Sequence, residues 1–351
     1  MPMQLGSKGE KVQRWQEFLA EQELLRPEAV HGDFDRETEH ATREYQELHE
    51  LVSDGVVGEL TLQAARNDGF QGGLDAPDYT LLYGLKNAAF PDIEHPSALV
   101  HIPPSFSAAD AAVVIYIHGI GNNIENVVRR VAISSQYPVA DLIGHLDRSG
   151  RNALLVVPEL RYNAASSDPG ALGQPGVLRP LLEEIFARLR RQFPGLRVDD
   201  IKHTVLISHS GGYRAAASLA VGGGVPVHEL YLLDSLYGHE DTFHGFLGQL
   251  LSGATSESVR RRRLVNLYTK SGGTYERSLA LAKQARDTLY TVGGDAKWVH
   301  TSDEPVTAAS ARFDARVIVQ RVAVGHSEIP IQFLGRLLAT SALPLRRGLV
   351  A

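Results

Sequence analysis

One serine stands on a predicted sharp turn between a strand and a helix, and it is the side chain best placed for chemistry. Residues 204–207 are continuously apolar or β-branched and predict a buried strand, whereas the alanine-rich residues 213–220 predict a helix. Ser210 lies between them. A serine hydroxyl is a weak nucleophile at neutral pH and needs a base within hydrogen-bonding reach. The segment therefore predicts nucleophilic catalysis if the fold brings a base to Ser210.

The same segment resembles the nucleophile elbow of the α/β-hydrolases. In that elbow, small residues two positions before and two positions after the serine let the strand and the helix approach closely. Ser208 and Gly212 occupy these positions, so the usual Gly-x-Ser-x-Gly reads Ser-His-Ser-Gly-Gly here. The departure is mild because serine is still small. The resemblance implies an α/β-hydrolase fold, a mostly parallel sheet flanked by helices, and acyl transfer through Ser210.

The resemblance also implies an oxyanion hole, in which fixed backbone N–H groups meet the charge that develops on a carbonyl oxygen. One donor should be the N–H of Gly211. Residues 113–123 supply a predicted strand that ends in a His-Gly loop, similar to the oxyanion motif of the family. We expect Ile120 or Gly121 to supply the second donor, and His118 to organise the loop.

The base and the acid should follow the nucleophile in the chain, because the family order is serine, acid, histidine. His326 follows the last predicted strand and precedes the C-terminal helix, where the catalytic histidine of this fold belongs. The alternative is a loop histidine that caps that helix. Asp234 closes the strand after the elbow helix and is the expected acid. Many members carry the acid one strand later, but that strand ends here without a carboxylate; Asp295 and Asp241 are the other candidates.

The N-terminal residues contain a short internal repeat. Residues 32–38 and 55–61 share a glycine, an apolar residue and a threonine at identical offsets. In each copy a glycine-containing turn leads into a predicted helix, with Asp35 or Gly58 suited to the N-cap. The preceding residues 12–19 have helical apolar spacing. We therefore expect three short helices joined by tight turns.

These N-terminal motifs resemble the peptidoglycan-binding domain family, from the Leu-Gly-x-x-Gly start at Leu5 to the Gly-x-x-Thr that ends at Thr61. His31 and Asp35 depart from the usual family residues, although aspartate still caps a helix well. The resemblance implies a non-catalytic helical module that holds an enzyme near bacterial cell-wall polymer. A module that has lost ligand binding and only packs on its neighbour is the alternative.

The chain is expected to form two domains around a Gly- and Asp-rich linker. We predict a peptidoglycan-binding-like helical domain at residues 1–70, a linker at 71–78 and an α/β-hydrolase domain at 79–351. In the large domain, apolar strands alternate with helical patterns, as in an α/β sheet architecture. The predicted strands are 97–102, 112–117, 153–157, 204–207, 230–233, 264–268 and 317–322, and the predicted helices are 181–191, 213–220, 278–288 and 331–338.

Composition excludes several other classes of protein. The 351 residues contain no cysteine, so thiol catalysis, disulfides and cysteine-based zinc sites are excluded. The net charge of −6 and the single basic run at residues 260–263, read as a solvated stretch before a strand, give no reason to expect nucleic-acid binding. No apolar run is long enough for a transmembrane helix. No signal peptide is recognisable at the N-terminus.

We expect no cofactor and no metal. His239 and His244 are five residues apart, whereas a zinc-binding helix needs histidines at i and i+4 to face one way. Because this stretch follows Asp234 directly, we expect it to begin a short lid over the site.

The two-domain architecture is similar to that of the mycobacteriophage lysin B esterases. It implies a serine esterase or lipase-like hydrolase that acts on a carboxylic ester of the bacterial cell envelope and has peptidoglycan or another cell-wall polymer as its partner. The alternatives are a wall amidase or peptidase with the same Ser-His-Asp site, and a non-enzymatic wall-binding protein. The expected site of action is the envelope or the outside of the cell, reached by phage release, by a dedicated delivery apparatus, or after removal of a leader.

Overall fold

The computed structural model describes residues 3–68, 70, 79–91, 95–124, 141–162, 167–190, 192–252, 262–271 and 273–346. They divide into two compact units, one built mainly from Met1–Thr80 and the other from Leu81–Ala187 and Gly195–Ala351. The linker predicted at 71–78 lies outside the described residues. Within the described part, no helix is both long and apolar enough to cross a membrane.

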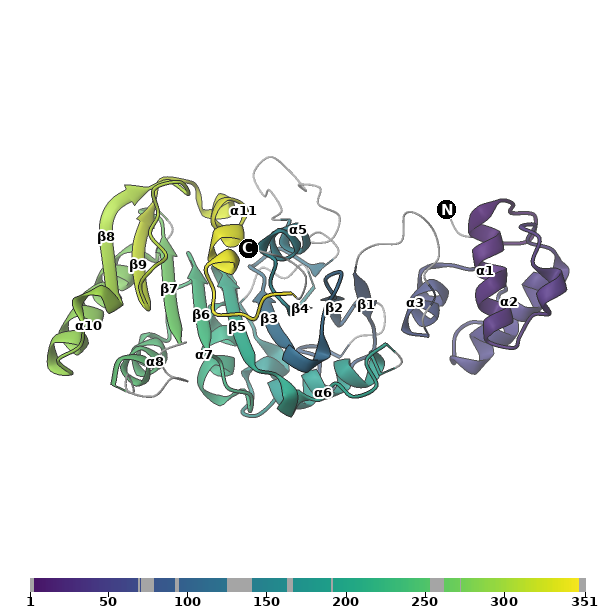
Figure 1. Ribbon diagram of the computed structural model, residues 1–351, viewed down its shortest axis with the longest axis horizontal. Helices are drawn as coiled ribbons and strands as arrows, with labels where there is room; N and C mark the ends of the chain where they lie inside the picture. Colours follow the sequence, from purple (N-terminus) through teal and green to yellow (C-terminus); the bar gives the residue numbers. More distant parts are fainter. Residues whose placement is uncertain are drawn as a thin grey trace. The chain divides into compact units, whose positions relative to one another are not determined.

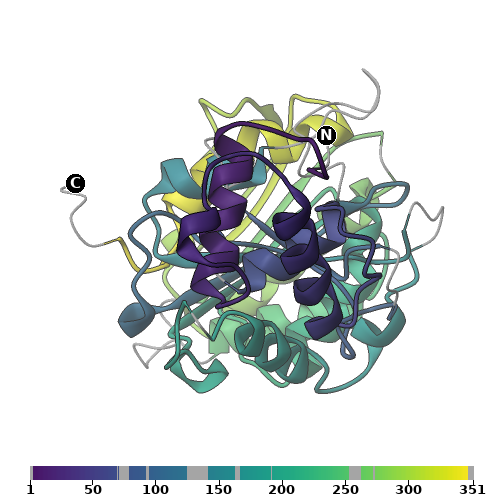
Figure 2. The same cartoon turned by 90° about the vertical axis from the view of Figure 1, so that its right-hand side faces the viewer.

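The N-terminal unit is helical, as predicted. Its helices are α1 (Glu10–Glu21), α2 (Arg36–Leu48) and α3 (Glu59–Asn67), and α1 packs against α2 (Figures 1 and 2). The Asp35 side chain caps α2 by accepting a hydrogen bond from the Thr38 N–H at 2.8 Å. The core is aromatic: Trp15 is fully buried and its ring meets Tyr45 edge to face at a centroid distance of 5.7 Å.

Two buried glutamines explain the internal repeat. The side-chain oxygen of Gln16 accepts from the Gly32 N–H at 2.7 Å, and its Nε2 donates to Thr38 Oγ1 at 2.8 Å. Gln46 makes the same pair of bonds in the second copy, at 2.9 Å each; its partners there are Gly55 N–H and Thr61 Oγ1. Glycine and threonine therefore recur at fixed offsets because each copy is tied to the preceding helix by one buried amide.

The large unit is built on a nine-stranded sheet with the order β1-β2-β4-β3-β5-β6-β7-β9-β8. Strand β2 is antiparallel to β4, and the pairs from β4 through to β8 are parallel. All seven predicted strands are present, and among the strands in the described part of the chain, β1 and β8 were not predicted. The strands are β1 (Thr80–Leu82), β2 (Ala98–His101), β3 (Ala112–Ile117), β4 (Ala153–Pro158), β5 (His203–His209), β6 (Glu229–Leu233), β7 (Arg263–Tyr268), β8 (Val299–Val306) and β9 (Val317–Val322).

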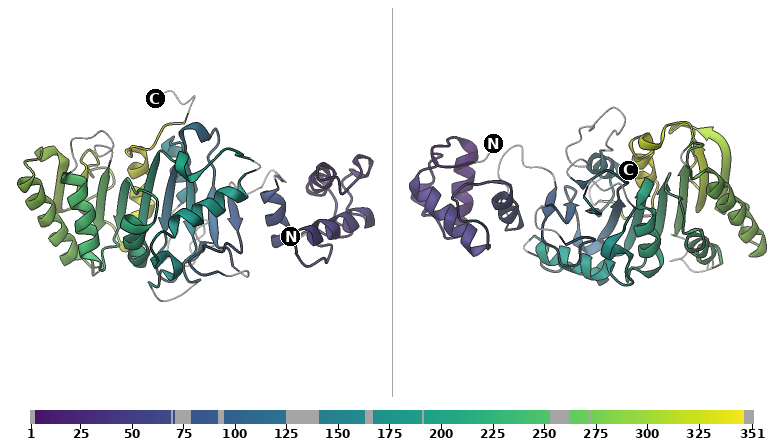
Figure 3. Two further views of the ribbon diagram at one scale, coloured as in Figure 1. Left: turned by 90° about the horizontal axis from the view of Figure 1, so that it is seen from below. Right: turned by 180° about the vertical axis from the view of Figure 1, so that it is seen from behind.

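Helices cover both faces of this sheet. The chain steps one way from β3 to β4 and the other way from β4 to β5, β6 and β7, so right-handed crossovers place the connecting helices on opposite faces. On one face α5 packs against α11, and on the other α8 packs against α7 and α10 (Figures 1 and 3). The helices are α5 (Leu142–Ser149), α6 (Leu178–Arg188), α7 (Tyr213–Gly222), α8 (Glu240–Ser252), α10 (Tyr275–Thr291) and α11 (Ile329–Ala339). The mostly parallel sheet, flanked by helices and preceded by a helical module, confirms the predicted fold class.

Two sequence-based expectations are wrong. The stretch after Asp234 does not begin a lid: it enters α8, which buries Phe243 and Leu247 as the crossover helix between β6 and β7. The chain needs such a helix because parallel neighbours cannot be joined by a tight turn. Arg263, at the end of the basic run, is buried in β7 rather than solvated, and its guanidinium lies 3.8 Å from the Glu229 carboxylate.

Candidate active site

The turn after β5 carries Ser210 in a strained backbone conformation. Ser210 has φ of +52°, in the left-handed region that a residue with a side chain seldom adopts, and α7 begins three residues later. The neighbouring small residues permit this turn. A Cβ added to Gly212 would lie 2.9 Å from the Ile117 carbonyl oxygen, and the Ser208 hydroxyl is buried against that of Ser235. The elbow therefore packs directly against the end of β3.

The loop that follows β3 lies against this elbow. A Cβ added to Gly119 would lie 2.8 Å from Ser210 Cβ, and one added to Gly211 would lie 3.2 Å from the Ile120 backbone nitrogen. A Cβ at Gly121 would meet open space. The structure thus brings Gly119 and Ile120 to the serine, with Gly121 further along the loop.

His118 and Glu159 hold the loop from behind. His118 is buried; its Nδ1 donates to the Gly119 carbonyl at 3.0 Å, and its Nε2 lies 2.8 Å from Glu159 Oε1. Glu159 Oε2 accepts from the Ile124 N–H at 2.7 Å. Sequence reasoning missed Glu159, although a carboxylate directly after β4, the strand next to β3, was a usable signal.

His326 and Asp234 are joined directly. His326 Nδ1 lies 2.8 Å from Asp234 Oδ2, where the ring N–H donates to the carboxylate. The Asp234 side chain is fully buried, whereas 32% of the His326 side chain is exposed. The carboxylate of Asp234 is therefore enclosed by the protein, whereas the His326 ring is accessible to a reactant.

Two threonines complete the environment of Asp234. The Thr269 N–H and hydroxyl donate to Asp234 at 3.2 and 2.7 Å, and the Thr274 hydroxyl also donates to it. Burial would raise the pKa of Asp234, but the hydrogen bonds from His326, Thr274 and Thr269 outweigh it and lower this pKa below its ordinary value. Asp234 is therefore an anion at neutral pH.

Neither threonine was predicted, yet Thr269 directly follows β7, the strand after which the sequence comparison with α/β-hydrolases led us to look for an acid. Since β6 and β7 are parallel neighbours with Leu233 opposite Leu267, a residue after β7 lies beside one after β6. Thr269, after β7, is not an acid but donates hydrogen bonds to the Asp234 carboxylate, which follows the neighbouring strand β6.

Ser210 and His326, the predicted nucleophile and base, lie at the same edge of the sheet without a direct bond. Among the described residues, no hydrogen bond joins Ser210 Oγ to His326. The two are linked through His209, whose Nε2 donates to the His326 carbonyl at 3.2 Å and whose ring lies 4.8 Å from that of His326. Such contacts are often long in unliganded enzymes and tighten when substrate binds.

His209, the other imidazole beside His326, is a much weaker base than an ordinary histidine. Burial and repulsion by a protonated His326 lower the pKa of His209 to about 4, so its ring is neutral at pH 7. It is therefore free to act as a hydrogen-bond donor to the backbone.

The other candidate acids lie elsewhere. Asp241 is an exposed residue of α8, and Asp295 is exposed and paired with Lys297 at 2.9 Å. Of the three candidates, the structure brings only Asp234 into hydrogen bonding with His326. Across the described residues, no group of three or more metal-ligating side chains is gathered in one place.

Solved structures similar to this chain include several hydrolases. A feruloyl esterase module from Clostridium thermocellum is 11% identical with a TM-score of 0.42, and covers 72% of this chain and 84% of its own. MPT51 from Mycobacterium tuberculosis is 12% identical with a TM-score of 0.40, covering 76% and 99%. S-formylglutathione hydrolase from Staphylococcus aureus is 11% identical with a TM-score of 0.39, covering 70% and 90%. No curated protein matches the sequence.

The N-terminal unit matches a known family in sequence. Residues 8–65 match the family described as "Putative peptidoglycan binding domain". The matched residues run from the turn before α1 into α3. This match confirms the family resemblance predicted from the glycine and threonine motifs of the N-terminal module.

Proposed function

We propose that this protein is a serine esterase with Ser210 as nucleophile, His326 as general base, Asp234 as the orienting acid, and Gly211 with Ile120 or Gly121 as oxyanion donors. The observation that carries the proposal is the buried Asp234 carboxylate, which holds His326 at 2.8 Å beside a serine in left-handed backbone geometry. A strained serine, a partly exposed imidazole and a buried carboxylate form the arrangement that activates a hydroxyl for attack on a carbonyl.

The reaction proceeds in two steps. Ser210 Oγ attacks the ester carbonyl while its proton passes to His326 Nε2, and His326 Nδ1–H remains bonded to Asp234, whose negative charge stabilises the imidazolium. His326 then donates that proton to the departing alcohol oxygen as the carbon–oxygen bond breaks. Water then attacks the acyl-serine while its proton passes to His326. His326 returns that proton to Ser210 Oγ as the bond between Oγ and the acyl carbon breaks, which releases the carboxylic acid and restores the enzyme.

Backbone donors stabilise the intermediate. Gly211 follows the nucleophile and precedes α7, so its N–H lies at the positive end of that helix. The Ile120 nitrogen is near Gly211, which makes it the better placed of the two candidates for the second donor. Two such donors meet the oxyanion without reorganisation during the reaction.

The N-terminal match supports a proposal for the substrate class. A peptidoglycan-binding module concentrates an attached enzyme on cell-wall polymer, which supports an association with the bacterial wall. We infer that the substrate is a carboxylic ester of the envelope, either a lipid or a wall-linked acyl ester. The site of action is then the cell envelope or the outside of the cell.

The test compares wild type with Ser210→Ala on a panel of soluble esters and on purified envelope fractions. We expect Ser210→Ala to lose turnover while its circular dichroism is unchanged, and Ser218→Ala, a matched change on α7, to retain it. Mass spectrometry of the products should show a carboxylic acid and an alcohol. Wild-type activity in Ser210→Ala would overturn the nucleophile, and release of amines or peptides would favour the amidase alternative.

A further inference from the structure

A pocket lies beside the proposed site, at the same edge of the sheet. Its volume is about 350 Å³, which is in the range of small-molecule sites. The residues that line it come from the segments before β2 and after β4: Phe90, Pro91, His95, Pro96, Glu159, Leu160, Arg161 and Tyr162. None of them is the nucleophile, the base, the acid or an oxyanion donor of the proposed reaction.

The strand order fixes how far this pocket is from the nucleophile. The pocket is at the carboxyl end of β4 and Ser210 at that of β5, and β3 lies between them. Because neighbouring strands are about 4.8 Å apart, the two strand ends are separated by about 10 Å. Ligands of open α/β sheets bind along this carboxyl edge. A substrate bonded to Ser210 would therefore reach the pocket with a part remote from its reacting carbonyl.

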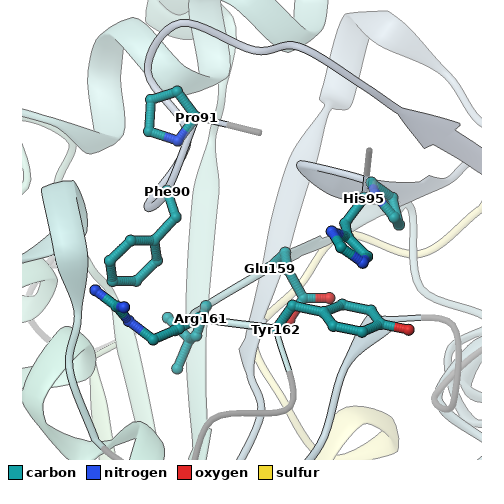
Figure 4. A pocket seen from close by; sticks show the side chains of 8 residues that line it. Phe90, Pro91, His95, Glu159, Arg161 and Tyr162 are labelled. Atoms are coloured by element: carbon teal, nitrogen blue, oxygen red, sulfur yellow. The ribbon is translucent and has the colours of Figure 1, made fainter. Parts of the chain in front are cut away.

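Two stacked pairs form the walls. The Arg161 guanidinium lies 4.6 Å from the centroid of the Phe90 ring, and the His95 and Tyr162 rings are 3.8 Å apart. Figure 4 shows Phe90 and Arg161 on one side of the pocket, His95 and Tyr162 on the other, and Glu159 between them. The pocket thus combines ring surfaces with a cationic hydrogen-bond donor.

This lining suits a sugar better than a fatty chain. An alkyl chain would desolvate the Arg161 guanidinium and the polar tip of Tyr162 without hydrogen bonding to them, which is costly. A sugar ring packs its C–H face on an aromatic ring while its hydroxyl oxygens accept from the guanidinium. Arg161 has donors to offer, because its ion pair with Asp168 is long, at 3.5 Å, and solvent-exposed.

We propose that this pocket is a sugar-binding subsite that holds a ring in the alcohol part of the ester, about 10 Å from the scissile bond. The inference rests on the proposed function and narrows its substrate to an acylated glycan. The peptidoglycan-binding match of the N-terminal module supports the same chemistry, because peptidoglycan is a glycan polymer.

Glu159 connects the subsite to the reaction. Its carboxylate lines the pocket and also holds His118 and the Ile124 N–H, and His118 in turn holds the loop that touches Ser210. A ring seated in the pocket therefore packs against the same carboxylate that positions the oxyanion loop.

The experiment measures kcat/KM of the full chain on three esters. Acetylated chitobiose carries a second sugar ring that reaches the pocket, p-nitrophenyl acetate has no group that reaches it, and p-nitrophenyl octanoate carries an alkyl chain. The variants are Arg161→Ala, Tyr162→Ala and Tyr162→Phe. Tyr290→Ala, at an exposed position on α10, is the control.

We expect Arg161→Ala to lower kcat/KM for the sugar ester about tenfold or more, through the loss of charge-assisted hydrogen bonds. Tyr162→Ala should lower it about fivefold and Tyr162→Phe much less, because the ring is kept. Activity on p-nitrophenyl acetate should stay within about twofold of wild type in all variants, as should the control on every ester.

Equal losses on all three esters, no loss on the sugar ester, or a selective loss on the octanoate would overturn the sugar subsite. These outcomes are separate from failure of the proposed function, which would appear as p-nitrophenyl acetate hydrolysis that does not depend on Ser210.

Discussion

Each unit of this protein contains a buried polar network, but the two networks differ in what they can do. In the N-terminal module, Gln16 and Gln46 are buried amides whose oxygen and nitrogen are both hydrogen-bonded. Neither side chain ionises near neutral pH. In the large unit, the buried Asp234 is paired to the partly exposed imidazole of His326. In both networks, polar groups that are buried and fully hydrogen-bonded make the structure rigid. Chemical reactivity needs in addition a titratable group that is accessible to solvent, as His326 is.

The largest effect should come from removing the charge of the second network while keeping its shape. Asp234→Asn is expected to lower kcat about 10⁴-fold, because the amide no longer stabilises the imidazolium or selects the correct tautomer of His326. The measurement is steady-state hydrolysis of p-nitrophenyl acetate, with circular dichroism to verify the fold. Asp241→Asn, at the exposed position on α8, is the matched control and should retain full activity. A loss of similar size in both variants would contradict the assignment of Asp234.

Breaking the first network should affect stability and leave chemistry untouched. Gln46→Ala leaves the Gly55 N–H without its buried acceptor, so we expect the free energy of unfolding of the module to fall by about 3 kcal/mol. Calorimetry and hydrogen exchange at the Gly55 amide measure this loss. Gln13→Ala, on the exposed face of α1, should have little effect. Hydrolysis of p-nitrophenyl acetate should be unchanged in both, and a parallel loss of esterase activity would refute the separation of roles.

The smallest expected effect is a change in how the stability of the large unit depends on pH. Thr274→Val removes one of the hydrogen bonds that lower the pKa of Asp234, so this pKa should rise toward its ordinary value. A carboxyl whose pKa is lowered by folding stabilises the protein above its unfolded pKa of about 4, and this contribution is lost as the pH falls through the folded pKa.

The variant should therefore be less stable than wild type at neutral pH, and it should lose less stability than wild type as the pH falls below about 4. Thermal unfolding between pH 2 and pH 7 gives the two profiles, and Thr288→Val, at a half-buried position in the last turn of α10, serves as the control. Superimposable profiles for Thr274→Val and wild type would mean that its hydroxyl does not stabilise the carboxylate.

Much of the fold could be predicted because its signals are local. Strands buried on both faces are continuous apolar runs, as in β3 and β4, and all of the central strands were identified this way. Strand β8 was missed because none of its side chains is fully buried and most of them are polar, and β1 because it is only three residues long. Helix α8 was mistaken for the start of a lid because it follows Asp234 closely in the chain, whereas its role as the crossover depends on the parallel pairing of β6 with β7.

By itself, the amino-acid sequence determined the helical N-terminal module, the parallel sheet and the elbow around Ser210. Each of these depends on residues close together in the chain, whose periodicity and turn chemistry act locally. Only the tertiary structure showed that Thr269 and Thr274 hold Asp234, that Glu159 holds His118, and that a pocket opens beside β4. These contacts join residues 35 to 41 positions apart, and the free energy that pairs them comes from burial that no single segment achieves alone.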